Sequence, residues 1–215
     1  MIEEGVVSIT ETFENLDYEK RKRILNAALK EFADNGYDRA STNQIVKNAG
    51  IGKGMLFYYF KNKRELYYYL ANYSMDITIK DYFAKFNENE PDFIERLKQS
   101  SKIKMHFFAE HPNVFQFLGT FFLIADDQLP EDLKEKYHKL TEIGYKKLYQ
   151  DIDYSLFREG IDVEKAFQLI QWAIEGYQQD LKKRLQGKVF STIDLKPYWD
   201  EFYEYLDVLK KSFYK

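Results

Sequence analysis

Side chains that can donate hydrogen bonds to phosphate oxygens or to base edges are concentrated between Ser41 and Lys63. Hydroxyl, amide and ammonium groups form such bonds, and glycine allows a backbone to come close to a duplex. We therefore predict that this stretch binds DNA, with contacts from Ser41, Thr42, Asn43, Lys53, Gly54, Met55, Tyr58, Tyr59 and Lys63. The alternative is a buried three-helix bundle whose charges are merely solvated.

Two short helices must position these side chains. Ser41 and the glutamine three residues after it form a capping-box pattern, which predicts a helix that starts there and ends at Gly50. A second helix is expected from about residue 53 to residue 59, with Leu56 and Phe60 four residues apart on its buried side. The glycine-containing turn lets the two helices cross at a steep angle, as in a helix-turn-helix.

From Gly36 to Leu66 the chain resembles the TetR (tetracycline-repressor-like) family of bacterial transcription regulators. The resemblance rests on residues that fit the family's pattern in order: Ala49, Gly50, Gly54, Leu56, Tyr59, Phe60, Lys63 and Leu66. It implies that Ser41 and Tyr59 contact phosphates and that Lys63 caps the next helix against the backbone. The residues it places nearest the base edges are Asn43, Lys53, Gly54 and Tyr58.

Three positions depart from that pattern. Gly52, Met55 and Phe57 stand where the family usually has Ser, Thr and Tyr, so each position lacks a hydroxyl group. The family docking is therefore expected with fewer hydroxyl contacts.

The charge distribution agrees with a nucleic-acid interface near the N-terminus. Between Tyr18 and Leu66 there are eleven Lys and Arg residues and five acidic residues, so this part carries +6. Since the whole chain carries −3, the remainder carries −9. A basic module on an acidic body is typical of a DNA-binding protein with a second domain of another function.

Apolar periodicity predicts an all-α protein of about nine helices. Residues 1–16 have little pattern and are expected to be a flexible arm, followed by a helix-turn-helix domain at 17–66 and an effector-binding and dimerisation domain at 67–215. Helices are expected at 17–35, 63–86, 91–110, 113–126, 130–159, 162–185 and from 194 to the end, besides the two short ones.

Aromatic residues make up 18% of the chain, enough either for a bulky core or for a cavity that holds an apolar ligand. The resemblance implies such a cavity in the C-terminal domain. Its candidate lining residues are Phe107, Phe108, Phe115, Phe121, Phe122, Tyr145, Tyr149, Trp172 and Tyr177, with Glu175 as a charged anchor. Plain core packing is the alternative for each of them.

The last two helices carry heptad-like apolar seams. These seams suggest a four-helix bundle formed by two copies of the chain, with Phe167, Ile170, Ile174, Trp199, Phe202, Leu206 and Leu209 in the interface. The alternative is that both seams face the chain's own core.

Little in the sequence indicates catalysis. Glu135 and His138 have the spacing of a di-iron motif, but such sites need the motif twice. Without a cysteine, a glycine-rich phosphate loop or a nucleophile elbow, we expect no enzyme, metal or cofactor.

No signal peptide or long apolar run is evident, so we expect a soluble, cytoplasmic protein. Two functions remain. One is a homodimeric repressor that a small, largely apolar or aromatic effector releases from a palindromic DNA operator. The other is a helical ligand-binding or architectural DNA-binding protein that no small molecule regulates.

Overall fold

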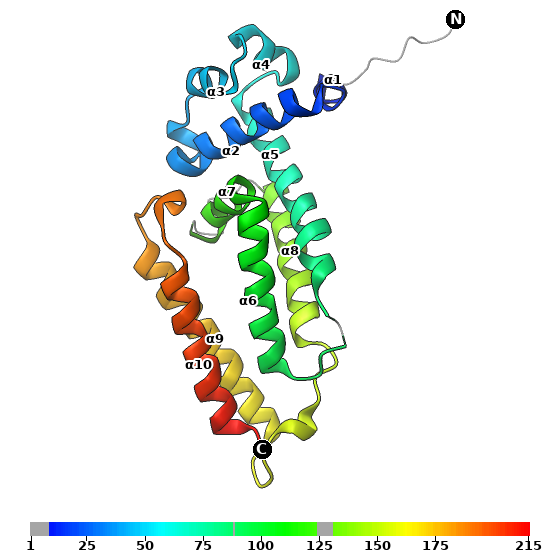
Figure 1. The fold of residues 1–215 in the computed structure, drawn as a ribbon, viewed down its shortest axis with the longest axis vertical. Helices are drawn as coiled ribbons and strands as arrows, with labels where there is room; N and C mark the ends of the chain where they lie inside the picture. The colour runs from blue at the N-terminus through cyan, green and yellow to red at the C-terminus, as the bar shows by residue number, and fades with distance from the viewer. Residues whose placement is uncertain (1–8, 88, 124–130) are drawn as a thin grey trace, which may run out of the picture.

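The computed structural model describes residues 9–87, 89–123 and 131–215, which form ten α-helices and no strand (Figure 1). The N-terminal module contains α1 (Ile9–Glu14), α2 (Tyr18–Arg39), α3 (Thr42–Ala49) and α4 (Lys53–Tyr59). The body contains α5 (Lys63–Ile77), α6 (Phe93–Glu110), α7 (Pro112–Leu123), α8 (Glu131–Tyr149), α9 (Val163–Leu185) and α10 (Lys196–Phe213). The all-α prediction is confirmed.

The molecule is elongated, with α3 and α4 at one end (Figure 1). Helix α5 runs from the N-terminal module into the body, beside α6 and α8, while α9 and α10 pair along the other side of α6. Because α5 belongs to both halves, the predicted domain boundary at Leu66 stays a prediction. Within the described ranges, no helix combines the length and hydropathy that a bilayer crossing requires.

Most predicted helix starts are confirmed by their caps. The side chains of Ser41, Asn62 and Asp162 accept hydrogen bonds from the third backbone N–H that follows each of them. Gly50 ends α3 in the left-handed conformation, with φ of 65°. Gly36 directly follows the helix predicted at 17–35 and has φ of 66°, but it marks a kink, after which α2 continues to Arg39.

The prediction of a flexible arm at residues 1–16 is wrong for part of that segment. Residues 9–14 form α1, and the ring of Phe13 is completely buried. Burial of a full phenylalanine ring supplies the stability that so short a helix lacks by itself. Residues 1–8 lie outside the described part of the chain.

Two long helices end earlier than predicted. The helix expected at 63–86 changes after Ile77 into a π-helical turn, η1 (Thr78–Tyr82), and then a 3-10 turn, η2 (Phe83–Lys85). The helix expected at 130–159 ends at Tyr149, before Asp151 in the left-handed region and the 3-10 turn η4 (Tyr154–Leu156). The end of the helix expected at 113–126 lies outside the described residues.

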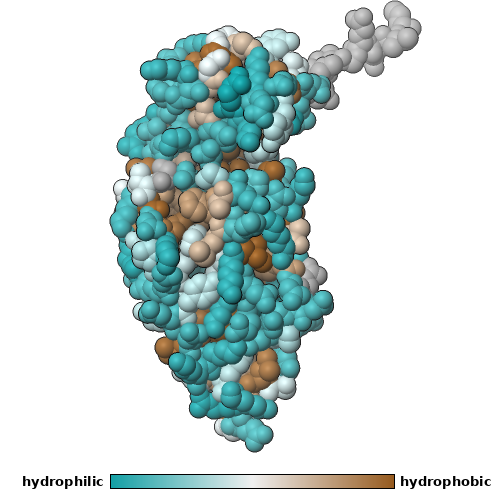
Figure 2. Space-filling model, viewed as in Figure 1, coloured by the Kyte–Doolittle hydropathy of each residue, from teal (hydrophilic) through white to brown (hydrophobic). Residues whose placement is uncertain are grey.

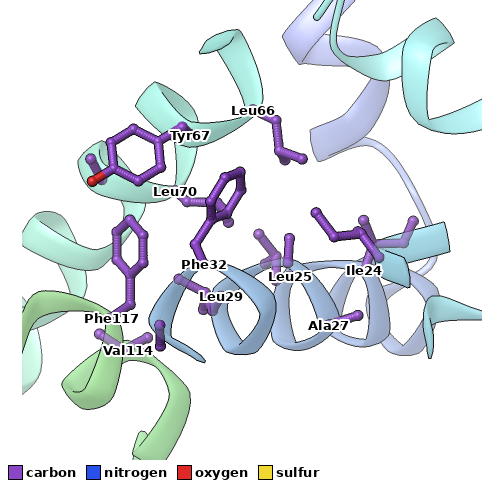
Figure 3. Packing of buried hydrophobic residues seen from close by; sticks show 14 of the residues in the cluster. Ile24, Leu25, Ala27, Leu29, Phe32, Leu66, Tyr67, Leu70, Val114 and Phe117 are labelled. Carbon is purple, nitrogen blue, oxygen red and sulfur yellow. The ribbon is translucent and has the colours of Figure 1, made fainter. Parts of the chain in front are cut away.

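The main core joins the N-terminal module to the body. Figure 3 shows α2 side chains, Leu25, Leu29 and Phe32 among them, facing Leu66 and Leu70 of α5, with α7 beside them. A second core, around Phe93 and Ile170, holds α6, α9 and α10 together at the far end of the body.

A buried arginine fixes the point at which α8 ends. The guanidinium of Arg96 on α6 donates hydrogen bonds to the carbonyls of Lys147 (3.4 Å), Asp151 (3.2 Å), Gln150 and Glu90. The last carbonyls of a helix have no partner within the helix, so an external donor satisfies them. Arg96 therefore determines the end of α8 that apolar periodicity did not reveal.

We expect Arg96→Met to lower the free energy of unfolding by about 3 kcal/mol, since several buried carbonyls would lose a charged donor. Urea unfolding monitored by circular dichroism measures this change. Arg158→Met is the matched control, because Arg158 also donates to a backbone carbonyl, that of Lys211 (3.1 Å), but is exposed. Equal losses in both variants would contradict the role given to Arg96.

Candidate nucleic-acid interface and apolar cavity

Helices α3 and α4 are packed as a helix-turn-helix at the end of the molecule. Ile45, Val46 and Leu56 face the core, and Glu31 of α2 anchors the start of α3 because its carboxylate accepts from the backbone N–H of Ser41 (2.9 Å). The exposed positions of the two helices are Ser41, Asn43, Gln44, Lys47, Asn48, Lys53, Gly54, Phe57 and Tyr58. The arrangement therefore presents amide, hydroxyl and ammonium groups on the outside of the N-terminal module.

The structure places the predicted DNA contacts in different environments. Ser41, Asn43, Lys53, Gly54 and Tyr58 are exposed, while Thr42 and Met55 are half-buried.

Tyr59 differs from the expectation of a surface contact. Its side chain is only 4% exposed, and its ring lies 5.6 Å from that of Phe13 and 5.6 Å from that of Tyr58. Since α1 covers it, Tyr59 is a packing residue beneath the outer face of α4.

Lys63 is engaged within the chain. Its ammonium group donates to the carbonyl of Asp38 (3.0 Å) and lies over the ring of Tyr37, 5.1 Å from the ring centroid. Asp38 lies near the end of α2, where carbonyls lack helical partners and a cation is favourable. Lys63 therefore ties the start of α5 to the end of α2.

Two lysines on the outer face of α3 and α4 are not paired in this way within the described residues. Lys47 on α3 and Lys53 on α4 are exposed and form no ion pair with any residue in the described ranges. Lys47 was not among the DNA contacts predicted from the sequence, although its position two residues after the apolar Ile45 on a capped helix was a usable signal. Both ammonium groups are available to phosphate.

Burial raises the pKa of two phenols behind this surface. Desolvation, followed by the neighbouring Tyr37 and Tyr68, raises the pKa of Tyr67 to about 12. Desolvation, followed by the charge of Glu14, raises the pKa of Tyr69 to about 12. The direction of both shifts agrees with the packing of these rings in the core beneath the helix-turn-helix.

An apolar cavity of about 400 Å³ lies in the body, next to the N-terminal module. Figure 2 shows apolar side chains at the surface in the middle of the molecule, below that module. The lining comes from η1, η2, α6, α7, α8, α9, the segment before α10 and α10 itself, and it includes Tyr82, Phe83, Phe107, Phe115, Leu118, Phe122, Leu140, Leu181, Phe190 and Trp199. Lys104, which is exposed, is the one cation among the lining residues described.

Only some of the predicted effector residues line this cavity. Phe107, Phe115 and Phe122 do, and the ring of Phe108 lies 5.1 Å from that of Phe115. Phe121 packs instead in the main core beside Tyr67.

The other predicted effector residues lie elsewhere. Tyr145 and Tyr149 stack on each other at 4.3 Å, away from the lining, and Trp172 and Glu175 are exposed on α9. Tyr177 lies between α9 and α10, where its hydroxyl donates to the carbonyl of Tyr198 (2.7 Å). Helical spacing alone could not show which face of each helix borders the cavity.

The side chains of the two predicted dimer seams pack against one another within the chain, and their place in a dimer interface stays a prediction. Ile170, Ile174 and Leu206 are buried, and Phe167, Phe202 and Leu209 pack against them. Trp199 lines the cavity. These residues were chosen for their strong periodicity, but periodicity identifies a buried face without saying what buries it.

Next to these seams, α9 and α10 also carry an apolar face that is exposed. It carries Leu169, Trp172, Tyr205 and Val208, of which Trp172 is 59% and Val208 60% exposed. A groove between the two helices is bordered by this face and by four residues of the predicted seams; its lining includes Ala173, Gly176, Tyr205 and Val208 together with Ile174, Phe202, Leu206 and Leu209.

The histidines form no recognisable centre. His106 and His111 lie 3.1 Å from the carboxylates of Glu110 and Asp81, and Glu135 pairs with Lys139 (2.7 Å). In the parts of the chain that the structure covers, no three His, Cys, Asp or Glu side chains are grouped closely enough to hold a metal ion.

Comparison with known proteins identifies the fold and the family. Residues 24–70 match the family model of bacterial regulatory proteins of the tetR family. The fatty acid metabolism regulator protein of Bacillus subtilis is 30% identical over 172 residues, which cover 73% of this chain and 80% of the relative.

Solved structures share the fold over nearly the whole chain. A TetR family transcriptional regulator from Chloroflexus aurantiacus has a TM-score of 0.59 at 24% identity, covering 96% of this chain and 98% of that one. The transcriptional regulator FadR from Bacillus subtilis, in complex with stearoyl-CoA, has a TM-score of 0.51 at 21% identity, covering 87% and 96%. On the strength of the helix-turn-helix and of the 30% identical relative, the chain belongs to the TetR family of DNA-binding transcription regulators.

Proposed function

We propose that this regulator is a homodimeric repressor that leaves a palindromic operator when a long acyl chain enters the cavity of the body. The observation that carries the proposal is the apolar cavity itself, whose walls include the turns at the end of α5, the helix that begins in the N-terminal module. The comparisons support an acyl effector, since the Bacillus subtilis relative is named a fatty acid metabolism regulator and the structure of FadR from Bacillus subtilis contains stearoyl-CoA.

DNA is bound by the outer face of α3 and α4. Lys47 and Lys53 contact phosphates, and Asn43, Gly54 and Tyr58 are the residues proposed nearest the base edges. Tyr59 and Lys63 act indirectly, through the packing of α4 and the junction between α2 and α5.

The cavity suits a chain of methylene groups with an anionic end. Its volume lies within the range of small-molecule sites, and phenylalanine, leucine and tryptophan make up much of its wall. Lys104 provides a cation for the polar end of the ligand, and it has no ion-pair partner among the described residues.

Two routes connect the cavity to the DNA-binding helices. One is α5, because Thr78, Tyr82 and Phe83 line the cavity at its end. The other is α7, which carries Phe115 and Phe122 on the cavity side and packs on α2 through Phe117, 6.4 Å from Phe32 between ring centroids. A hundredfold change in DNA affinity needs a differential binding energy of about 2.7 kcal/mol, which roughly 100 Å² of extra apolar burial supplies.

A second copy of the chain covers the exposed face of α9 and α10. Ala173 and Gly176 leave room for close approach of a helix, and no atom lies within 4 Å of the position that a Cβ on Gly176 would take. Trp172 and Val208 supply apolar area beside them. Two recognition helices held about 34 Å apart could then enter successive major grooves.

We expect Lys53→Ala to weaken binding to the selected duplex by roughly tenfold and to reduce the salt slope by about 1 per half-site, since one phosphate contact is lost. Fluorescence anisotropy at several salt concentrations measures both. Lys183→Ala, which removes an exposed lysine on α9, is the control and should change neither. An unchanged salt slope for Lys53→Ala would remove α4 from the interface.

Stearoyl-CoA should raise the melting temperature and lower DNA affinity together, because one linkage produces both effects. Affinity should increase about fourfold for each added methylene until the cavity is full. Thermal shift and DNA release with a series of acyl-CoA lengths measure this, with coenzyme A alone as the control.

Lys104→Gln should lower the affinity for the anionic ligand by about tenfold and leave the affinity for the matching fatty alcohol unchanged. Release by coenzyme A alone would contradict an acyl effector. Release by none of these compounds would favour an architectural protein without a small-molecule effector.

Val208→Glu should convert the dimer to monomer, because an unpaired carboxylate at the interface costs several kcal/mol. Analytical ultracentrifugation measures the molecular mass. Tyr154→Glu places the same charge at an exposed aromatic outside α9 and α10 and should leave the dimer intact. A dimeric Val208→Glu variant would move the interface to another face.

A further inference from the structure

Helix α4 has little stability of its own. It contains seven residues, and Gly52 at its N-cap provides no side-chain hydrogen bond. A helix of this length is marginal in water, so its orientation depends on the elements packed against it. Within the described part of the chain, α4 packs mainly on α3 and on α1.

Helix α1 contacts α4 through one completely buried ring. The ring of Phe13 lies 5.6 Å from Tyr59, 4.8 Å from Phe60 and 5.4 Å from Tyr69, measured between ring centroids. Tyr59 ends α4, Phe60 follows it and Tyr69 is on α5. Phe13 thus fills the space between the end of the recognition helix and the helix that leads into the body.

The position of α1 is in turn fixed by α2. The guanidinium of Arg21 donates to the carbonyl of Glu14 (2.6 Å), and the backbone N–H of Leu16 donates to the carbonyl of Phe13 (3.2 Å). The Asp17 side chain caps α2 directly afterwards by accepting from the backbone N–H of Lys20 (3.1 Å). Phe13 is therefore held by α2 while it supports α4.

Phe13, which supports α4, lies outside the part of the chain that the family model matches, since that part begins at residue 24. Tyr59 connects the packing of Phe13 to the surface, since its ring lies against that of Tyr58, an exposed residue on the proposed DNA-binding face. We propose that Phe13 is a positioning residue for DNA recognition, which orients α4 by packing beneath Tyr59 and Phe60.

Loss of Phe13 should therefore affect sequence-specific and non-specific DNA binding differently. Base contacts require α4 at a fixed orientation in the groove, whereas contacts to phosphate need mainly positive charge near the duplex. Loss of the Phe13 ring leaves a cavity beneath Tyr59 and frees α4 to reorient, without removing any positive charge. Specific binding is lost and non-specific binding remains.

The test uses the full chain and a duplex selected from a random library by the wild-type protein, with a mixed-sequence duplex of equal length. Phe13→Ala should weaken binding to the selected duplex by more than about tenfold and change binding to the mixed duplex by less than about twofold. Phe13→Leu, which fills much of the space, should restore most of the specific affinity. Phe93→Ala, which removes an equally buried ring in the far core of the body, should leave the ratio of the two affinities unchanged.

Hydrogen exchange provides a second measurement that needs no DNA. Amides of residues 53–60 should exchange faster in Phe13→Ala at a temperature at which α9 remains protected. An unchanged affinity ratio together with unchanged exchange of α4 would overturn the proposal, as would equal loss of specificity in Phe93→Ala.

The inference rests on the proposed function only for its DNA readout. If the wild-type chain selected no sequence at all, the proposed repressor function would fail. The exchange of α4 would then still decide whether Phe13 orients it.

Discussion

Aromatic packing among α2, α5 and α7 is the joint on which the rest of this structure depends. The ring of Phe32 on α2 lies 5.1 Å from Tyr67 on α5, and Tyr67 lies 5.4 Å from Phe117 on α7. Edge-to-face rings at these distances bury large areas and restrict one another's orientation. As Figure 3 shows, this cluster is formed by helices from both halves of the molecule, so the N-terminal module is not suspended from a flexible linker.

A packed joint of this kind suits a protein in which one end must respond to the other. Close-packed interiors transmit displacement because they have few voids into which a strained side chain can relax. The walls of the cavity include residues of η1, η2 and α7, which are continuous with or pack upon the elements that hold α2 and α5. A close contact adds to this coupling, since a Cβ on Gly119 of α7 would lie only 2.5 Å from the ring of Phe190, another lining residue.

The charge distribution also differs between the N-terminal module and the body. The basic excess lies in the N-terminal module, where Lys47 and Lys53 face outward, while the cavity has a largely uncharged wall. Ion pairs in the body act mainly as ties between helices: Lys98 on α6 pairs with Asp207 on α10 (2.7 Å), and Lys210 on α10 pairs with Asp92 (2.8 Å). Each of these partly buried pairs contributes little by itself, but together they fix the register of α10 against α6.

Local signals in the sequence were sufficient for the fold class, the helix-turn-helix and most helix starts. A cap such as Ser41 or a stop such as Gly50 acts within four residues of chain, so its physical cause is visible in the sequence. The same holds for the family pattern from Gly36 to Leu66, which consists of closely spaced turn and core residues.

Tertiary structure alone decided what each apolar face meets. Ile174 and Leu206 have the periodicity of an interface yet lie in the chain's own core, while Trp172 and Val208 remain exposed. Phe13 lacked any helical pattern around it and is nevertheless completely buried, and the end of α8 is set by Arg96 from a helix about fifty residues earlier. These outcomes depend on contacts between distant segments, and burial is a property of such contacts rather than of the residue or its spacing.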